Sequence, residues 1–303
     1  MVYPYDPLAK DTPVFLKFIE DFWSGYNDRI AYLRSMLNAV VCSKITYQVI
    51  FYIFGPGAPG KFQLPTLLIA LIGEQSGVST TLNALSNDQY EVANLVGKKL
   101  VLINETSDIM KDLTRVKRYS GLDSFRGRRM NIQGRIEVRP EGVLVGVGNS
   151  PLEIQDTGNT MVRRLRSFKT TIPSNSRSPL ISRTGFYNWE RPLKKELSGI
   201  LNWVLDIEDK QVDDYIIRTE ENVLSLKSSF QQSKLSMNSV LKWVEQEGTS
   251  IDGETFIGWY SLEKKQQGAT KGVFLYPPYL TWCKRYKENP VDQTKFSHQV
   301  LEV

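Results

Sequence analysis

Three short apolar runs place the strongest limit on how this chain can fold. Val49–Phe54, Leu100–Ile103 and Val143–Val147 consist almost wholly of aliphatic and aromatic residues, without the polar alternation of a half-exposed strand. Such uninterrupted runs are typical of strands that are buried on both faces. Because helical or mixed segments separate the three runs, the sequence predicts an α/β fold with a parallel sheet.

Segments with helical periodicity lie before, between and after these predicted strands. Residues 12–37 predict an amphipathic helix with a break near Ser24-Gly25, and Leu67–Leu71 and Leu197–Ile207 predict two more helices. Residues 208–236 mix charged residues with Ser and Gln and predict an exposed linker or helix. Two further helix faces near the C-terminus are marked by Phe274, Leu280, Cys283 and Tyr286, and by Phe296, Val300 and Leu301.

A glycine-rich loop lies between the first predicted strand and the next predicted helix. Gly55–Lys61 reads G-P-G-A-P-G-K and fits the pattern G-x-x-x-x-G-K. Glycines allow backbone N–H groups to close around phosphates, the helix N-terminus adds a favourable dipole, and Lys61 would bridge the terminal phosphates. The alternative is a plain Gly/Pro turn. The residues predicted to bind nucleotide are Gly55, Pro56, Gly57, Ala58, Pro59, Gly60, Lys61 and Phe62.

Phe62 departs from this pattern, because a working loop has Ser or Thr there to hold Mg²⁺. Thr66 is expected to lie too far along to replace that hydroxyl, and Pro65 is expected to disturb the first turns of the helix. A second explanation is a compensated frameshift or a sequencing error. If Phe62-Gln63 is encoded by TTC-CAG, reading one base later gives Ser-Ser, which the nucleotide sequence of the gene would test.

Polar residues follow two of the buried strands. Glu105 comes directly after Leu100–Ile103 and Asn104, where an acid beside a phosphate loop suits the Walker B role of polarising the attacking water and facing Mg²⁺. Asn149 follows the third strand, where an amide can orient that water and sense the γ-phosphate. The alternatives are a surface Glu that ends a strand and an ordinary turn Asn.

The net charge of +5 comes from one part of the chain. Between Arg115 and Arg139, eight basic residues face only two acids, so this window carries +6 and the remainder sums to −1. Ser124–Met130 and Ile136–Arg139 are predicted to pair as a hairpin within it. A second basic cluster, Arg163–Arg166, either forms a solvated face or supplies an arginine to a subunit boundary, where it can stabilise a transferring phosphoryl group.

The order of these features resembles the superfamily 3 helicases, specifically the phage and plasmid primase-helicase family that includes the poxvirus nucleoside triphosphatase. The likeness extends over nearly the whole chain. It rests on Tyr5–Pro7 and Phe15–Phe18 before the ATPase, on Ser79–Leu82 and Val92–Leu100 between Walker A and B, on Ser120–Asp123 at motif B-prime, on Gly148–Pro151 at motif C, on Arg163–Leu165 at the arginine-finger segment, and on Leu275–Leu301 in the winged-helix region.

The resemblance implies an AAA+-like P-loop ATPase core with a helical N-terminal segment and a partial C-terminal winged helix. It implies an ATP- and Mg²⁺-dependent, usually hexameric motor that moves on single-stranded DNA during replication. The catalytic positions would be Lys61, Glu105, Asn149 and Arg163 or Arg164, with the arginine reaching the ATP of the neighbouring subunit. The basic hairpin would face the central pore and contact DNA phosphates independently of sequence. Its expected DNA contacts are Lys117, Arg126, Arg128, Arg129 and Arg135.

The same resemblance predicts four parts. These are a helical segment (1–45), the ATPase core (46–172), a helical lid and linker (173–235) and a partial winged helix (236–303). The family normally carries a primase or primase-associated region before the motor, and no such region fits here. The wing strands are also expected to be absent. We therefore expect a motor segment or fragment that works with a primase partner.

The composition of the chain disfavours several other classes of protein. No apolar run reaches the roughly 18 residues of a membrane span, and the N-terminus lacks the features of a signal peptide. Two cysteines, Cys42 and Cys283, suggest reduced thiols in the cytoplasm or an equivalent reducing compartment such as an organelle stroma, rather than secretion. The single histidine, His298, disfavours a His-rich zinc site and a Ser-His-Asp triad.

Two alternatives to a helicase motor remain. The first is a degenerate relative that binds DNA and nucleotide without turnover, because Phe62 removes the Mg²⁺-binding hydroxyl. The second is a small-molecule kinase that uses the phosphate loop. The basic hairpin and the long helical flanks disfavour the kinase.

Overall fold

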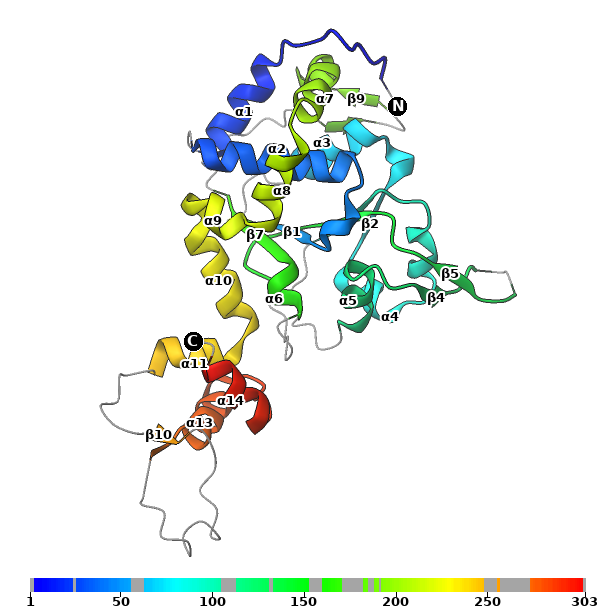
Figure 1. Ribbon diagram of the computed structural model, residues 1–303. Coiled ribbons are helices and arrows are strands. Elements are labelled where there is room, and N and C mark those ends of the chain that lie inside the picture. Colours follow the sequence, from blue (N-terminus) through cyan, green and yellow to red (C-terminus); the bar gives the residue numbers. More distant parts are fainter. Residues whose placement is uncertain are drawn as a thin grey trace, which may run out of the picture.

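Five parallel strands form the central sheet, in the order β2-β3-β6-β1-β7 (Figure 1). The predicted runs form β1 (Ile50–Phe54), β3 (Leu100–Ile103) and β6 (Val143–Gly148), so the predicted α/β class and parallel sheet are confirmed. The strands β2 (Gly77–Thr80) and β7 (Leu165–Lys169) were not predicted and extend the sheet at its two edges.

The computed structural model describes most of the chain. The described residues are 3–23, 26–55, 63–104, 113–130, 133–152, 160–170, 182–184, 188–190, 192–247, 255–256 and 273–301. None of the helices within these ranges is long and apolar enough to cross a membrane.

Side chains on the two faces of the sheet belong to two different hydrophobic clusters. Along β1, Phe51 and Ile53 join one cluster, whereas Ile50, Tyr52 and Phe54 join the other. Successive residues of a strand point to opposite faces, so β1 is buried from both sides. This burial explains why its sequence shows an unbroken apolar run rather than alternation.

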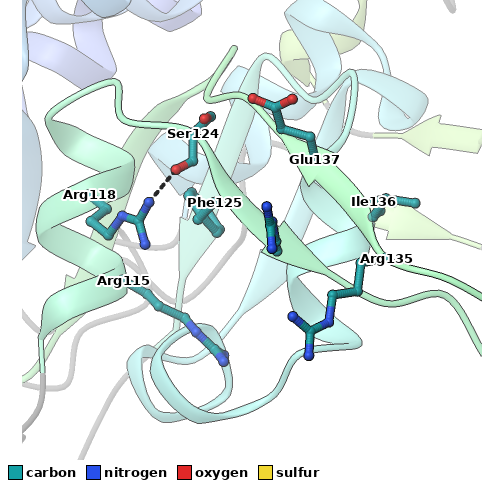
Figure 2. A pocket seen from close by; sticks show the side chains of 8 residues that line it. Arg115, Arg118, Ser124, Phe125, Arg135, Ile136 and Glu137 are labelled. Carbon is teal, nitrogen blue, oxygen red and sulfur yellow. Dashed lines mark hydrogen bonds between the residues drawn. The ribbon is translucent and has the colours of Figure 1, made fainter.

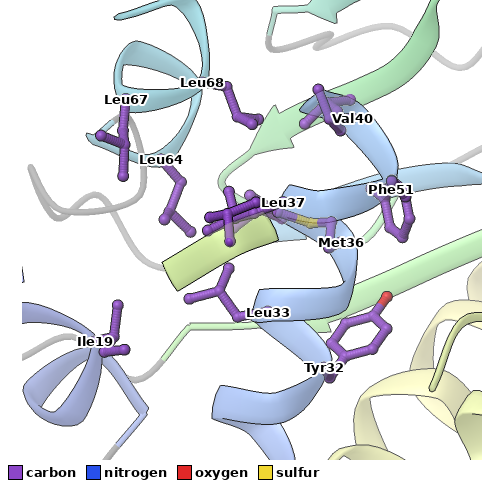
Figure 3. Close-up of a cluster of buried hydrophobic side chains, with 14 of the residues drawn as sticks. Ile19, Tyr32, Leu33, Met36, Leu37, Val40, Phe51, Leu64, Leu67 and Leu68 are labelled. Atoms are coloured by element: carbon purple, nitrogen blue, oxygen red, sulfur yellow. The ribbon is translucent and has the colours of Figure 1, made fainter. Parts of the chain in front are cut away.

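The first face is covered by helices from distant parts of the sequence. They are α1 (Pro13–Trp23), α2 (Asn27–Val41), α3 (Gln63–Ile72), α7 (Leu197–Leu205) and α8 (Asp209–Ile217) (Figure 1). Figure 3 shows the side chains of α1, α2 and α3 meeting β1 in one cluster. The predicted break near Ser24-Gly25 is confirmed by the ends of α1 and α2, although those two residues lie outside the described ranges.

One carboxylate ties the N-terminal helix to a segment 181 residues away. The backbone N–H groups of Val14 and Phe15 donate to the two carboxylate oxygens of buried Glu196, at 3.0 and 2.9 Å. The first N–H groups of a helix have no partner within it, so Glu196 satisfies two of those of α1. Helix α1 is therefore joined to the segment that leads into α7 by a polar contact as well as by apolar packing.

One local expectation was wrong, and one open alternative is decided. Helix α3 runs through Pro65 without interruption, because a proline in the first turn removes no intrahelical hydrogen bond. Of the linker and the helix that the sequence left open for residues 208–236, the helix is confirmed. These residues form α8, α9 (Thr219–Asn222) and α10 (Lys227–Met237), and a narrow apolar stripe among their charged residues is buried. The buried residues are Val212, Ile216, Val223, Leu226 and Phe230.

The second face carries α4 (Leu82–Asn87), α5 (Thr114–Ser120) and α6 (Thr160–Arg164), with an antiparallel hairpin of β4 (Phe125–Gly127) and β5 (Ile136–Val138). The predicted hairpin is confirmed, and it projects away from the sheet (Figure 1). The remaining short elements are η1 (Ile45–Tyr47), η2 (Glu74–Ser76), η3 (Glu91–Leu95), η4 (Pro192–Glu196), η5 (Leu224–Leu226), and the antiparallel pair β8 (Ser182–Thr184) and β9 (Asn188–Glu190).

The C-terminal elements have a hydrophobic cluster of their own. They are α11 (Ser239–Glu247), β10 (Thr255–Phe256), β11 (Val273–Phe274), α13 (Tyr276–Tyr286) and α14 (Gln293–Leu301). Helix α10 leads from the sheet toward them (Figure 1). The two predicted helices are confirmed as α13 and α14. However, Phe274 lies in β11 before α13 begins, and Tyr286 and Leu301 are exposed rather than part of the buried faces. The cluster contains Val240, Trp243, Tyr276, Tyr279, Trp282, Cys283, Val291 and Phe296.

Candidate functional site

The carboxyl ends of the parallel strands meet at one edge of the sheet. Phe54 at the end of β1 pairs with Gly148 of β6 on one side and with Lys169 of β7 on the other. Ile103 at the end of β3 pairs with Gly146. Ligands of open α/β sheets bind outside the carboxyl ends of the strands, which makes this edge the candidate site. The structure therefore brings together the positions that follow β1, β3 and β6.

Gly55 begins the predicted phosphate loop where two strand ends approach each other closely. Thr170 donates its backbone N–H to the carbonyl of Phe54 at 2.7 Å, and a Cβ atom on Gly55 would lie 2.5 Å from Thr170 Oγ1. Only glycine fits this approach without moving β7. The predicted nucleotide-binding residues that follow, 56–62, lie outside the described part of the chain, and they include Lys61 and Phe62.

Asn149 is exposed at the end of β6, in a turn that is held by Tyr52 of β1. The phenol of Tyr52 crosses β6 where Gly146 and Gly148 leave room, since a Cβ on Gly146 would lie 2.6 Å from the ring and one on Gly148 would collide with the phenol oxygen. The Tyr52 hydroxyl donates to the carbonyl of Ser150 at 3.2 Å. Tyr52 therefore fixes the turn that carries Asn149.

The sequence did not single out Tyr52, but it did hold a signal. Two glycines separated by one residue within a buried strand mark a close approach by a neighbouring group. Gly146 and Gly148 show this spacing, and Tyr52 is the group that fills the space.

Asn104 continues β3 and is oriented by β2. Its backbone N–H donates to the carbonyl of Thr80 at 2.9 Å, and its Nδ2 donates to Ser79 Oγ at 2.8 Å. Thr81 then caps α4 by accepting from the N–H of Ala84 at 3.1 Å. Glu105, the predicted Walker B acid and Mg²⁺ ligand, lies outside the described ranges directly after Asn104.

The two candidate finger arginines occupy different environments. Arg164 donates from Nη1 to the carbonyl of Lys117 at 2.6 Å and to Ser120 Oγ at 3.1 Å, and it is half-buried. Arg163 is exposed at the same end of α6. The next arginine, Arg166, is held inside the protein, because its Nε donates to the carbonyl of Ile216 at 3.0 Å and its burial lowers the pKa of the guanidinium.

The hairpin has one apolar and one basic face. Phe125 pairs with Val138, and both are buried, whereas the next pair, Arg126 and Glu137, is exposed. A Cβ on Gly127 would lie 2.9 Å from Val92, so the apolar face rests closely on η3. The predicted DNA contacts Arg126, Arg128, Arg129 and Arg135 are all exposed, and Lys117 on α5 is half-buried.

The described groups at the strand edge suit a phosphate-bearing ligand better than a bare metal ion. Asn104 and Asn149 expose amide side chains there, whereas Gly55 and Thr170 are buried. Within the described ranges, no group of three or more His, Cys, Asp or Glu side chains could hold a metal ion.

Comparison with known proteins gives a fold relationship. No family model matches this chain. The A form apo structure of the NrS-1 C terminal region has a TM-score of 0.53 and 18% identity, over 74% of this chain and 55% of that chain. A second apo structure of the same region (305-718) gives 0.53 and 17%, over 74% and 55%. A structure of JCV Helicase gives a TM-score of only 0.30 at 12% identity, too low to establish a shared fold.

The chain thus shares its fold with the NrS-1 C terminal region and spans about half the length of the solved chains it matches. At such low identity the likeness concerns the fold alone.

Proposed function

We propose that this chain is the motor part of an ATP-dependent helicase or translocase that acts on single-stranded DNA in the replication of a phage, a plasmid or a related element. The observation that carries the proposal is the meeting of Gly55, Asn104 and Asn149 at one edge of a parallel sheet. Their order in the sequence, together with the basic hairpin, resembles the superfamily 3 helicases. The fold shared with the NrS-1 C terminal region supports an α/β core of this kind.

Each residue has a role in this proposal. The loop from Gly55 to Phe62 and the Lys61 ammonium hold the phosphates of ATP, Glu105 polarises the attacking water, and Asn149 orients it. Mg²⁺ would neutralise the charge that develops on the phosphates. Arg163 extends to the nucleotide of a neighbouring copy in a hexameric ring, since Arg164 is engaged with α5.

The hairpin grips DNA in the same proposal. Lys117, Arg126, Arg128, Arg129 and Arg135 contact phosphates, so binding is independent of sequence and weakens with salt. A primase acts as a partner of the motor in this proposal. The reduced cysteines, Cys42 and Cys283, favour the cytoplasm or a similar reducing compartment.

A degenerate DNA-binding relative is the second candidate, and Phe62 is the observation that favours it. Without the hydroxyl, the loop still cradles phosphate but loses a Mg²⁺ ligand, which weakens transition-state stabilisation. A small-molecule kinase is disfavoured, because the exposed arginines of the hairpin have no role in binding a small acceptor.

Comparing the wild type with Phe62→Ser separates the two candidates. We expect nucleotide binding in both proteins, and faster DNA-stimulated hydrolysis in the variant because the Mg²⁺-binding hydroxyl is restored. Lys61→Ala is the matched control and should lose hydrolysis in both backgrounds. Hydrolysis that stays absent in both proteins, while single strands still bind, would contradict the motor proposal and favour the degenerate relative.

A further inference from the structure

A cavity of about 820 Å³ lies between helix α5 and the β4–β5 hairpin (Figure 2). Arginines from both elements line it. Arg115 and Arg118 come from α5, and Arg126 and Arg135 come from the hairpin. The remaining lining residues are Ser124, Phe125, Ile136 and Glu137.

The one acid of the lining does not balance these charges. Glu137 pairs with Arg139, Oε1 to Nε at 3.7 Å, and Arg139 does not line the cavity. Figure 2 shows the Glu137 carboxylate on the side opposite to the ends of Arg115 and Arg135, which extend toward the same space. Within the described ranges, no ion pair is formed by any of the four lining arginines. Four positive charges therefore share the cavity.

Arg115 is the member that most needs a ligand. Its Nη1 is buried and has no hydrogen-bond partner within the described part of the chain. A buried donor without a partner is costly, and more so on a charged group. Arg118, by contrast, donates to the carbonyl of Ser124, which fixes it between α5 and the hairpin (Figure 2). The cavity thus has an oriented arginine beside an unsatisfied one.

The chemistry of the lining suits an oxyanion such as phosphate. All four cations are arginines, whose planar guanidinium groups bind phosphate oxygens through paired hydrogen bonds. The lining also includes two apolar side chains, buried Phe125, which is held edge-on against Tyr119 at 6.2 Å between ring centroids, and half-buried Ile136. A lining of arginines together with apolar side chains suits a phosphate ester that carries a sugar or base.

We propose that this cavity is a phosphate-ester site, distinct from the nucleotide loop, in which Arg115 and Arg118 act together with Arg126 and Arg135. The inference rests on the proposed function for its source: a single strand held by the exposed arginines Arg128 and Arg129 of the hairpin passes its backbone over the root of the hairpin as well. A free nucleotide offers the same chemistry and is the second source that the test distinguishes.

The test measures binding of a labelled thymidine oligonucleotide to the full chain by fluorescence anisotropy, over a series of salt concentrations. In the Arg115→Gln/Arg126→Gln variant we expect the affinity to fall at least about tenfold near 0.1 M salt. The slope of log K against log salt should become shallower by about 0.7 for each phosphate contact that is lost. Arg115→Lys keeps the charge without the planar fork and should recover the slope but only part of the affinity.

The matched control removes the same charge elsewhere. Lys210→Gln/Arg218→Gln changes two exposed cations of the α8 region outside the cavity and should alter the affinity less than about twofold. Circular dichroism melting of each variant shows whether it is folded. Thymidine monophosphate is added as a competitor of the oligonucleotide, to test free nucleotide as the second source of the phosphate ester. Competition that is lost in the Arg115→Gln/Arg126→Gln variant, while oligonucleotide affinity is kept, assigns the cavity to free nucleotide.

Oligonucleotide affinity and nucleotide competition that both match the control would overturn the site. This result is separate from the fate of the motor proposal. A wild type without DNA-stimulated hydrolysis, whose strand binding still depends on Arg115, would keep the site and reject the motor. Stimulated hydrolysis in the wild type, with oligonucleotide and nucleotide binding unaffected by the cavity variants, would keep the motor proposal and reject the site.

Discussion

Arg164 closes the C-terminal end of helix α5 by donating from Nη1 to the carbonyl of Lys117 at 2.6 Å. The same nitrogen donates to Ser120 Oγ at 3.1 Å, and a Cβ on Gly121 would lie 3.1 Å from both terminal nitrogens. The Lys117 carbonyl also accepts the N–H of Gly121 at 2.8 Å, so the guanidinium adds a charged donor to it and meets the negative end of the helix dipole. Arg164 thus holds α6 against α5, whereas its neighbour Arg163 remains exposed.

This contact predicts opposite effects for the two arginines. Arg164→Ala should lower the free energy of unfolding by about 1–3 kcal/mol, because it removes the two hydrogen bonds from a charged donor that join α6 to α5. Arg163→Ala should change the stability by less than about 0.5 kcal/mol and lower DNA-stimulated ATP hydrolysis by a factor on the order of a thousand. Urea unfolding and steady-state hydrolysis measure the two effects. If Arg164→Ala loses only activity at unchanged stability, the assignment is reversed.

Tyr52 is predicted to position Asn149 through the turn after β6. Tyr52→Phe removes only the hydroxyl that donates to the Ser150 carbonyl, so we expect a loss of stability of about 1 kcal/mol and a lower kcat with little change in KM. Gly148→Ala should cost more, about 1–3 kcal/mol, because the new methyl group meets the Tyr52 phenol.

The double variant provides the control for this pair. If Tyr52 and Gly148 touch, their effects should be coupled, and the two substitutions together should cost less than the sum of the single ones. Strict additivity would contradict the close approach that the structure shows.

The hairpin arginines are predicted to bind DNA without reading its sequence. Arg128→Ala/Arg129→Ala should weaken binding to all single-stranded sequences alike and make its salt dependence shallower. Anisotropy measurements on oligonucleotides of different sequence, at several salt concentrations, test this expectation. Unchanged binding would remove the hairpin from the DNA contact surface.

Alkaline pH should destabilise the fold through Tyr119. Burial is the main cause that raises the pKa of Tyr119 to about 12 from an ordinary value of 10.0, and its hydroxyl accepts a hydrogen bond from the N–H of Gly142. A raised folded-state pKa means that this contribution is complete below pH 10 and is lost as the pH rises toward 12.

Tyr119→Phe should therefore make the loss of stability over this pH range shallower, by up to about 2–3 kcal/mol. Urea midpoints of the wild type and the variant, measured at several values across the range, provide the comparison. Equal slopes would show that Tyr119 ionises as easily in the folded protein as in the unfolded chain.

The strands that could be predicted are those buried on both faces, because burial leaves an apolar run in the sequence. The run Val49–Phe54 is such a case. Strand β7 escaped notice because it contains Arg166 and Ser167, which look out of place in a buried strand. Both are satisfied by residues far along the chain, since Arg166 donates to Ile216 and Ser167 bonds with Ser233. No local pattern reveals such partners.

The candidate site likewise contains features that the sequence predicts and features that it does not. The glycine loop and the polar strand ends follow from local sequence, because each directly continues a buried strand. The difference between Arg163 and Arg164 does not, since it depends on a carbonyl of α5. Arg115 and Arg118 lie three residues apart, a spacing that places side chains on one helix face and was the available signal for the cavity.

ATP hydrolysis by the purified chain, with and without single-stranded DNA, tests the central claim most directly. The account predicts hydrolysis that single strands stimulate, that Phe62→Ser increases and that Lys61→Ala abolishes. Single-strand binding with no stimulated hydrolysis, in both the wild type and Phe62→Ser, would contradict the motor and leave a DNA-binding relative without turnover.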